Sequence, residues 1–487
     1  MESFECRGKW NIHHPDQTNI EGILKFNPIN GGQLLLEFGS EQHDLINGQT
    51  RYEILDGQGD DGTSYTVIGC MYRGVNILLY QGNKKIIQHH YDVNIIIKDQ
   101  KFHNVDKIRF SQFQVNFLHL PEWLGLFDSF NFNKQQINSK SIKFHGYTFR
   151  LVSDFTIEND TSIDAKKNID IKKKTWILIE PHKPKYLEEV ILIIEKIQKF
   201  LTFSTSHYNI PLTLKARAEK EKPDSDVQIY YKLGYWDSSY FTPSSNIMLL
   251  THNDILESFG NLESFFRNWI KIVDELHHVV FDSYVINLIN PHISEDVMFL
   301  NFVRGLESLH RIRFPEDRLS QEEYDRRMEY ILSRIENKEY KRWFKGKLKR
   351  GYEWNLEQRL NKLTENDKLM RSKLFENDKT LHSLTTIIQG RRNYLAHLDQ
   401  DNPYKKLDIK DLKIINSIMR KILEVLLLRD LKIQETIIEK IISRNLQTKP
   451  IFYSVEKHKE KIDEFLEHVH AIWPENELND NQSKNSS

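Results

Sequence analysis

The sequence has few cysteines and no long apolar run. Of its 487 residues only Cys6 and Cys70 are cysteines, which excludes a disulfide-rich scaffold and a cysteine-rich zinc site. So few cysteines are typical of a reducing cytoplasm, and we expect the protein there. No stretch reaches about 18 apolar residues without charges, so we expect no membrane-spanning helix and no membrane partner. Residues 1–6 show no basic patch before an apolar run, and we expect no signal peptide.

Motifs for nucleotide and metal chemistry are also lacking. The sequence contains no P-loop, no G-x-G-x-x-G, no H-E-x-x-H and no paired C-x-x-C. Its most glycine-rich stretch, Asp56–Gly62, carries carboxylates that would repel a phosphate, and it predicts an acidic hairpin turn. Pairs of adjacent histidines lack further metal ligands at suitable spacing. We therefore expect no metal and no cofactor.

Charge is unevenly distributed along the chain. The formal net charge is −1, but residues 301–445 hold 32 Lys and Arg against 23 Asp and Glu, a surplus of nine. A basic C-terminal part suggests an anionic ligand, although surface lysines of a helical domain would give the same count. The length predicts two or three domains, and 39% hydrophobic and 28% charged residues are typical of a folded globular protein.

Residues 1–240 are predicted to be rich in β-strands. Short apolar runs separated by glycines are typical of an antiparallel sandwich or barrel; they lie at 22–26, 33–38, 64–70, 75–80, 91–97 and 110–117. A helix is predicted at 187–202, with strands at 175–179 and 227–231. The polar stretches 158–174 and 216–226 are predicted to be loops.

From about residue 253 the apolar spacing becomes helical. Helices are predicted at 262–282, after Ser294 as N-cap, and at 321–337, 340–349, 354–362, 379–398, 409–429 and 432–444. The fold class is therefore α+β multidomain, with a β-rich sandwich-like or barrel-like N-terminal domain before an all-α bundle. We predict a β-rich domain at 1–240, a helical connector at 241–292, a helical domain at 293–446, and an extension at 447–487 whose tail, from 474, is disordered.

The segment Gly390–His397 contains the pattern R-N-x-x-x-H on Arg392, Asn393 and His397. Arg392 is a permanent cation that can hold a phosphate, and His397 can move a proton near neutral pH. Asn393 can orient either one, so the three side chains suit the cleavage of RNA without a metal. Arg392 and His397 are about 140° and about 7.5 Å apart on a helix, so one copy would grip one phosphate poorly and two copies could share a groove. The alternative is an exposed arginine and a histidine that caps the helix C-terminus.

Two other segments carry notable side chains. In Phe302–Arg311, Glu307 lies within an apolar helix face. The segment 339–354 is dense in cations, including Lys341, Arg342, Lys345 and Lys347, with interleaved aromatic residues, and this mixture suits single-stranded RNA. For the aromatic residues we favour a place in the core of an amphipathic helix, while the cations remain candidates for RNA binding.

Together these motifs resemble the HEPN superfamily of all-helical ribonucleases. The R-N-x-x-x-H form falls on Arg392, Asn393 and His397, and the L-E-x-x-H-R segment at 306–311 looks like the first HEPN helix of ApeA-type anti-phage proteins. Those proteins also carry a β-rich N-terminal domain. The resemblance covers residues 290–445, and over the N-terminal half it is one of architecture.

The resemblance implies a metal-independent endoribonuclease, active as a homodimer or higher homo-oligomer with two motifs in one composite cleft. His397 would act as general base or acid, Arg392 would stabilise the charge on the phosphate, and Asn393 would orient them. A ribose 2′-OH as nucleophile makes RNA the substrate, with tRNA as one candidate. Glu307 would pair with Arg392 or Arg391 and hold it, or would form a buried salt bridge between helices.

The implied biological role is an effector of bacterial anti-phage defence that acts by abortive infection. The β-rich domain would sense a phage-derived trigger or restrain the nuclease. The alternative is a non-catalytic HEPN-like adaptor that binds nucleotide, RNA or protein. A third role, in nucleotidyl transfer onto a partner or as its target, is weaker because the chain lacks a transferase motif.

Overall fold

The computed structural model describes most of residues 1–448. It omits 13–18, 40–49, 80–84, 126–140, 145, 160–168, 220–225, 233–247, 290–291, 366, 374–377 and 399–401, and beyond 448 it describes only 464, 467 and 468. The chain forms two compact units, one of Met1–Leu256 with Gly260–Arg267 and one of Glu257–Phe259 with Asn268–Ser487. The predicted disordered tail lies outside the described residues, and the predicted boundaries at 240, 292 and 446 stay predictions.

The first unit is a β-rich unit, as predicted. Its described strands are β1 (Phe4–Asn11), β2 (Ile20–Asn27), β3 (Gly31–Gly39), β4 (Arg51–Gly59), β5 (Ser64–Leu79), β6 (Lys85–Lys98), β7 (Phe110–Phe117), β8 (Ile142–Phe144), β9 (Tyr147–Asn159), β10 (Ile169–Pro181), β11 (Pro211–Ala218) and β12 (Asp226–Tyr231). Its described helices are η1 (Val105–Lys107), α2 (Leu120–Trp123), α3 (Leu187–Thr205) and most of α4 (His252–Phe259).

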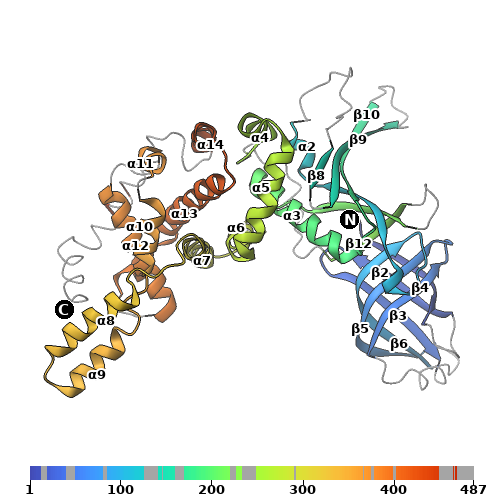
Figure 1. The fold of residues 1–487 in the computed structure, drawn as a ribbon. Coiled ribbons are helices and arrows are strands. Elements are labelled where there is room, and N and C mark those ends of the chain that lie inside the picture. Colours follow the sequence, from blue (N-terminus) through green and yellow to red (C-terminus); the bar gives the residue numbers. More distant parts are fainter. Residues whose placement is uncertain are drawn as a thin grey trace. The chain divides into compact units, whose positions relative to one another are not determined.

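Six of these strands close into a ring. Antiparallel pairing runs β3-β2-β1-β4-β5-β6, and β6 returns to β3 through the partners Gly32↔Val93 to Gly39↔Ile86. The end of β6 continues past the ring and pairs with β12, which leads into the order β12-β11-β7-β10-β9-β8 (Figure 1). In β2, buried Ile20, Leu24 and Phe26 alternate with less buried residues, as expected for strands with one face on a core.

Three predictions within this unit need correction. The lysine-rich segment predicted as a loop at 158–174 is strand at both of its described ends, because β9 extends to Asn159 and pairs with β10 from Ile169 onward. The loop predicted at 216–226 is wrong at both ends, because β11 reaches Ala218 and β12 begins at Asp226, while residues 220–225 lie outside the described residues. The turn predicted at 56–62 begins later, because β4 extends to Gly59. Gly57 belongs to that strand and lies under Trp10, whose ring would come within 2.4 Å of a Cβ there.

The second unit is helical. Its described helices are α6 (His277–Ile289), α7 (Glu295–Arg313), α8 (Gln321–Ser333), α9 (Lys338–Lys347), α10 (Leu356–Thr364), α11 (Lys368–Lys373), α12 (Asp378–His397), η3 (Pro403–Lys406), α13 (Ile409–Asp430) and α14 (Glu435–Thr448). Helix α5 (Leu262–Glu275) contributes residues to both units. The single helix predicted at 262–282 is therefore wrong, since α5 ends at Glu275 and α6 begins at His277. The ring centroids of Trp269 and Phe281 lie 4.9 Å apart across the break. Twelve residues of straight helix would separate the two positions by about 18 Å.

Helix α7 lies at the centre of the helical unit and contacts α6, α10, α12 and α13. Ser294 caps it as predicted and accepts a hydrogen bond from the Val297 amide. Its buried side chains, which include Phe302, Leu306 and Leu309, each contribute roughly 1.5–3 kcal/mol by leaving water. Contacts at both ends show that α7 and α13 run parallel: Asn416 donates to the Glu295 carbonyl, and Arg313 donates to the Leu426 carbonyl. Among the described residues, no helix has the length and apolar character needed to cross a lipid bilayer.

Candidate functional site

The residues of the R-N-x-x-x-H pattern lie on the last turns of α12. Arg392 and Asn393 are half-buried and His397 is exposed. The Arg392 Nη1 atom donates a hydrogen bond of 3.3 Å to the Asn393 Oδ1 atom. Asn393 and His397 are four residues apart, so they share a helix face. Asn393 therefore connects the arginine to the face of the histidine, although Arg392 and His397 leave the helix in different directions.

The neighbouring Arg391 has a different environment. Its side chain is 6% exposed, and its Nη2 atom donates to Asp296 at 2.8 Å, at the start of α7. Its Nη1 atom donates to the carbonyl oxygens of Tyr404 at 2.8 Å and Lys405 at 3.2 Å. The guanidinium also lies over the Tyr394 ring. Arg391 thus joins α12, α7 and η3 through its two terminal nitrogens, whereas its buried Nε atom has no hydrogen-bond partner among the described residues.

Gly390 fixes the same end of α12 by its lack of a side chain. A Cβ at this position would lie 2.1 Å from the Tyr404 ring, so the ring packs directly on the helix backbone. Burial, and to a lesser degree the charge of Glu357, raises the pKa of Tyr404 to about 12, so its phenol stays neutral. The Asn402 side chain accepts a hydrogen bond from the Tyr404 amide and caps η3.

Helix α12 stops immediately after His397. Leu398 has a φ of 51°, in the left-handed region, and its amide donates to the Tyr394 carbonyl at 2.6 Å. A leucine in this conformation costs about 1–2 kcal/mol, so the surrounding structure must impose it. The result is that His397 occupies the last helical position, where its imidazole reaches solvent.

The expected pairing of Glu307 with Arg391 or Arg392 is not what the structure shows. The acidic partner of Arg391 is Asp296, and Arg392 donates to Asn393. Asp296 lies at the start of α7, beside the end of α12, whereas Glu307 lies about 16 Å further along α7. Burial, and then the charge of Arg311, lowers the pKa of Arg359, and the charges of Glu307, Glu353 and Asp317 oppose this shift.

His310, also in the L-E-x-x-H-R segment, forms a second histidine–arginine pair. It is fully buried, and Arg359 Nη1 lies 3.1 Å from its Nδ1 atom. A guanidinium has only donors, so Nδ1 accepts and the imidazole is neutral, with its proton on Nε2. Burial, and then the charge of Arg359, lowers the pKa of His310 to about 4. Sequence reasoning did not single out this pair, and the one available signal was a histidine at a position of the apolar face of α7.

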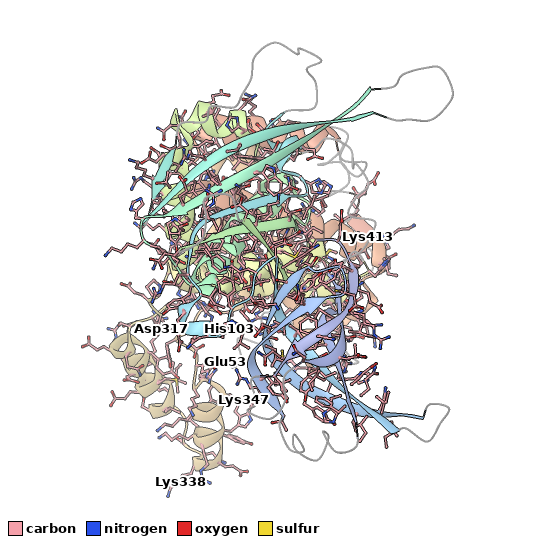
Figure 2. All side chains as sticks on the ribbon, turned by 90° about the vertical axis from the view of Figure 1, so that its right-hand side faces the viewer. Glu53, His103, Asp317, Lys338, Lys347 and Lys413 are labelled. Atoms are coloured by element: carbon pink, nitrogen blue, oxygen red, sulfur yellow. The ribbon has the colours of Figure 1, made fainter. Side chains whose placement is uncertain are left out.

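The predicted RNA-binding cations lie along α9, the second helix of the α8–α9 hairpin. Lys341, Arg342, Lys345 and Lys347 are all exposed, and none forms an ion pair with another described residue. Figure 2 shows Lys338 and Lys347 at opposite ends of α9. The favoured interpretation of the aromatic residues as core is wrong for Tyr340 and Trp343, which are 64% and 56% exposed. Within the described part of the unit, α9 packs mainly on α8, which leaves its outer face open.

The acidic, cysteine and histidine side chains offer no evident metal centre where they are described. No group of three or more of them is arranged to hold a metal ion within that part of the chain. The side chains that the R-N-x-x-x-H pattern places on α12 are a guanidinium, an amide and an imidazole.

Two family models match the chain. The ApeA N-terminal domain 1 matches residues 5–269, and the Apea-like HEPN domain matches residues 300–437. No curated protein and no solved structure matches it. The fold is thus that of a β-rich unit followed by a HEPN-type helical unit. The chain belongs to the family defined by the ApeA N-terminal domain 1, joined to an ApeA-like HEPN domain, and the HEPN family is in general one of nucleases.

Proposed function

We propose that the protein is a metal-independent endoribonuclease and an effector of anti-phage defence that acts by abortive infection. The proposal rests on the arrangement at the end of α12, where Arg392 is linked to Asn393 and the exposed His397 shares a face with Asn393. Its family context supports it, because the site lies inside the segment that matches the Apea-like HEPN domain.

In the proposed reaction the 2′-oxygen of a ribose attacks the adjacent phosphorus, and the bond from phosphorus to the 5′-oxygen breaks. The products are a 2′,3′-cyclic phosphate and a free 5′-hydroxyl. His397 takes the proton of the 2′-hydroxyl or supplies one to the leaving 5′-oxygen. Arg392 stabilises the charge on the phosphate oxygens, and Asn393 holds its guanidinium in place. RNA is the substrate because DNA lacks the nucleophile.

The active form is proposed to be a homodimer or a higher homo-oligomer. The reaction uses both a base and an acid, whereas one copy presents a single His397 on an open surface. Two copies related by a two-fold axis would supply two histidines and two Arg392 side chains to one cleft. The β-rich unit is proposed to sense a phage-derived trigger or to restrain the nuclease, and tRNA is a candidate substrate.

The test is cleavage of total RNA by the purified protein in the presence of EDTA, with detection of 2′,3′-cyclic phosphate ends. Arg392→Ala and His397→Ala should each lower cleavage at least about 100-fold and remove phage protection while the protein stays folded. Lys413→Ala, which removes an exposed cation from α13, is the matched control and should stay active. Full protection and cleavage by either site variant would refute the assignment. RNA binding without cleavage, during phage infection as well as in vitro, would instead support the adaptor.

A further inference from the structure

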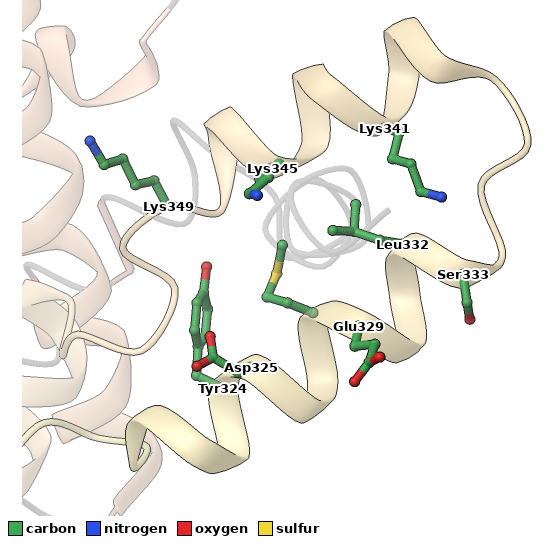
Figure 3. A pocket seen from close by; sticks show the side chains of 9 residues that line it. Tyr324, Asp325, Glu329, Leu332, Ser333, Lys341, Lys345 and Lys349 are labelled. Atoms are coloured by element: carbon green, nitrogen blue, oxygen red, sulfur yellow. The ribbon is translucent and has the colours of Figure 1, made fainter.

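Two clefts of the described structure are lined by residues outside the R-N-x-x-x-H pattern, and their charges differ. The α8–α9 hairpin forms a groove of about 540 Å³, with Lys341, Lys345 and Lys349 from α9 and Asp325 and Glu329 from α8 (Figure 3). Because this groove presents both lysines and carboxylates, it selects neither an anion nor a cation. The β-rich unit contains a larger cleft, of about 790 Å³, whose polar side chains are mostly uncharged.

This second cleft, which we call the sheet cleft, lies on one face of β7, β10, β11 and β12. Its floor consists of Asn116, Trp176, Thr213, Lys215 and Gln228. Thr213 pairs in register with Asn116, and Lys215 with Gln228, so each pair of side chains lies side by side. The alternate positions Val115, Leu214 and Ile229 are also in register, are fully buried, and point to the opposite face. The sheet thus has an apolar face and a face that presents polar groups to the cleft.

The polar side chains of the floor are available to a ligand. Among the described residues, the half-buried side chains of Thr213, Lys215 and Gln228 form no hydrogen bond and no ion pair. Asn116 donates to the Thr175 carbonyl through its nitrogen, which leaves its side-chain oxygen as an acceptor. Partly buried polar groups without a partner gain from a ligand that supplies hydrogen bonds.

The charge of the sheet cleft limits what it can hold. Glu2, which is exposed, and Lys215 are the two charged residues of its described lining, so the net charge is zero. The Lys215 ammonium lies 5.4 Å from the centroid of the Trp176 ring, which stabilises a cation at this place in the floor. Pro28 and Ile29, from the turn between β2 and β3, add an apolar wall. The cleft therefore suits a ligand that has one anionic group and a flat ring with hydrogen-bonding edges.

We propose that the sheet cleft binds a nucleoside monophosphate, with its phosphate at Lys215 and its base at the amides of Asn116 and Gln228. A side-chain amide presents a donor and an acceptor side by side, and this pair matches the edge of a base. The Thr213 hydroxyl can bond to the ribose, and the volume lies within the range of about 300–1,000 Å³ that is usual for ligand sites. This assignment goes beyond the proposed nuclease function and does not depend on it.

The experiment is calorimetric titration of the full chain with AMP, GMP, CMP and UMP, each beside its triphosphate. At least one monophosphate should bind with a Kd below about 1 mM, and more tightly than the more highly charged triphosphate. Lys215→Met should weaken this binding roughly 10- to 150-fold, the loss of one charged hydrogen bond, whereas Lys215→Arg should retain most of it. Gln228→Ala should weaken it roughly 2- to 10-fold. Lys183→Met, at an exposed lysine just after β10, is the matched control and should bind as the unaltered chain does.

Binding of none of the four monophosphates, or unchanged affinity in Lys215→Met, would overturn the inference. Ribose 5-phosphate that binds as tightly as the nucleotide would overturn it as well, because the cleft would then recognise a phosphate without a base. Thermal unfolding of the ligand-free variants verifies that Lys215→Met and Gln228→Ala are folded. The His397→Ala chain should bind the nucleotide with unchanged affinity, so failure of the nuclease assignment and failure of this one are distinguishable.

Discussion

The helical unit contains two histidine–arginine pairs, and their surroundings differ. At one end of α7, His310 is fully buried against Arg359, and its pKa falls to about 4. At the end of α12, His397 is exposed and Arg392 contacts Asn393. The residue types are the same, but burial leaves the first histidine neutral and closed to substrate. Exposure is what makes the second pair the candidate for chemistry.

The same contrast separates two consecutive arginines. Arg391 donates hydrogen bonds to Asp296 and to two backbone carbonyls. Among the described residues, the side chain of Arg392 donates only to the side-chain amide of Asn393. A structural role and the proposed catalytic role thus fall on consecutive residues of one helix. Substitutions that separate folding from activity test this division directly.

The largest effect is expected for the two arginines. Arg392→Ala should lower RNA cleavage by roughly 10²–10³-fold, the loss of one donor to the reacting phosphate, at unchanged stability. Arg391→Ala should lower the free energy of unfolding by roughly 3 kcal/mol, because it removes a buried guanidinium that pairs with the half-exposed Asp296 and leaves two carbonyls without a donor. Cleavage rates and denaturant-induced unfolding of both variants measure the difference. Equal activity loss and equal destabilisation in both would erase the proposed division.

A smaller effect concerns His310 and pH. Its pKa falls from 6.5 to about 4 on folding, so between these values the unfolded chain binds the proton more tightly. Stability is therefore lost as the pH falls, by roughly 2 kcal/mol between pH 7 and pH 5. His310→Gln keeps an acceptor for Arg359 but cannot titrate, so it should lack this loss. Urea unfolding of both proteins at the two pH values measures it, and parallel pH dependences would contradict the assignment.

The smallest effect is expected at Leu398. Leu398→Gly removes the strain of a φ of 51° but adds backbone freedom to the unfolded chain, so we expect stabilisation of at most about 1 kcal/mol. Ala396→Gly, two residues earlier and inside α12, provides the opposite control and should cost about 1 kcal/mol. Thermal unfolding compares them. A marked loss of stability in Leu398→Gly would show that the leucine side chain, and not the backbone, holds the end of the helix.

The sequence predicts the helical unit better than the strand pairing. Long periodic segments such as α12 and α13 can be predicted from the local sequence, because their apolar residues recur at helical spacing within the segment. The ring closed by β3 and β6 depends on pairs of residues 47 to 61 positions apart, and no local sequence pattern predicts such pairing. The strand at the start of β10 was missed for a related reason, since backbone pairing with β9 orders a lysine-rich segment.

At the site, the motif itself could be predicted from the sequence, but the division of labour within it could not. Arg391 and Arg392 are adjacent and chemically identical, and only the positions of Asp296 and of the carbonyl at Tyr404 distinguish them. The acid predicted from the sequence was Glu307, because it interrupts an apolar face. The acid that pairs with Arg391 is Asp296, which is nearly half exposed and belongs to no recognisable sequence pattern. The exposure of Trp343 could not be predicted either, since an amphipathic pattern does not show which faces of a helix pack against other elements.

The contact between Gly390 and Tyr404 has a consequence for how such proteins diverge. Since any Cβ at position 390 would overlap the tyrosine ring, the two positions cannot vary independently. A relative with alanine or a larger residue in place of Gly390 must carry a smaller side chain in place of Tyr404. Paired changes at these two positions in an alignment would therefore mark lineages that have rebuilt the support beneath the motif while leaving Arg392 and His397 in place.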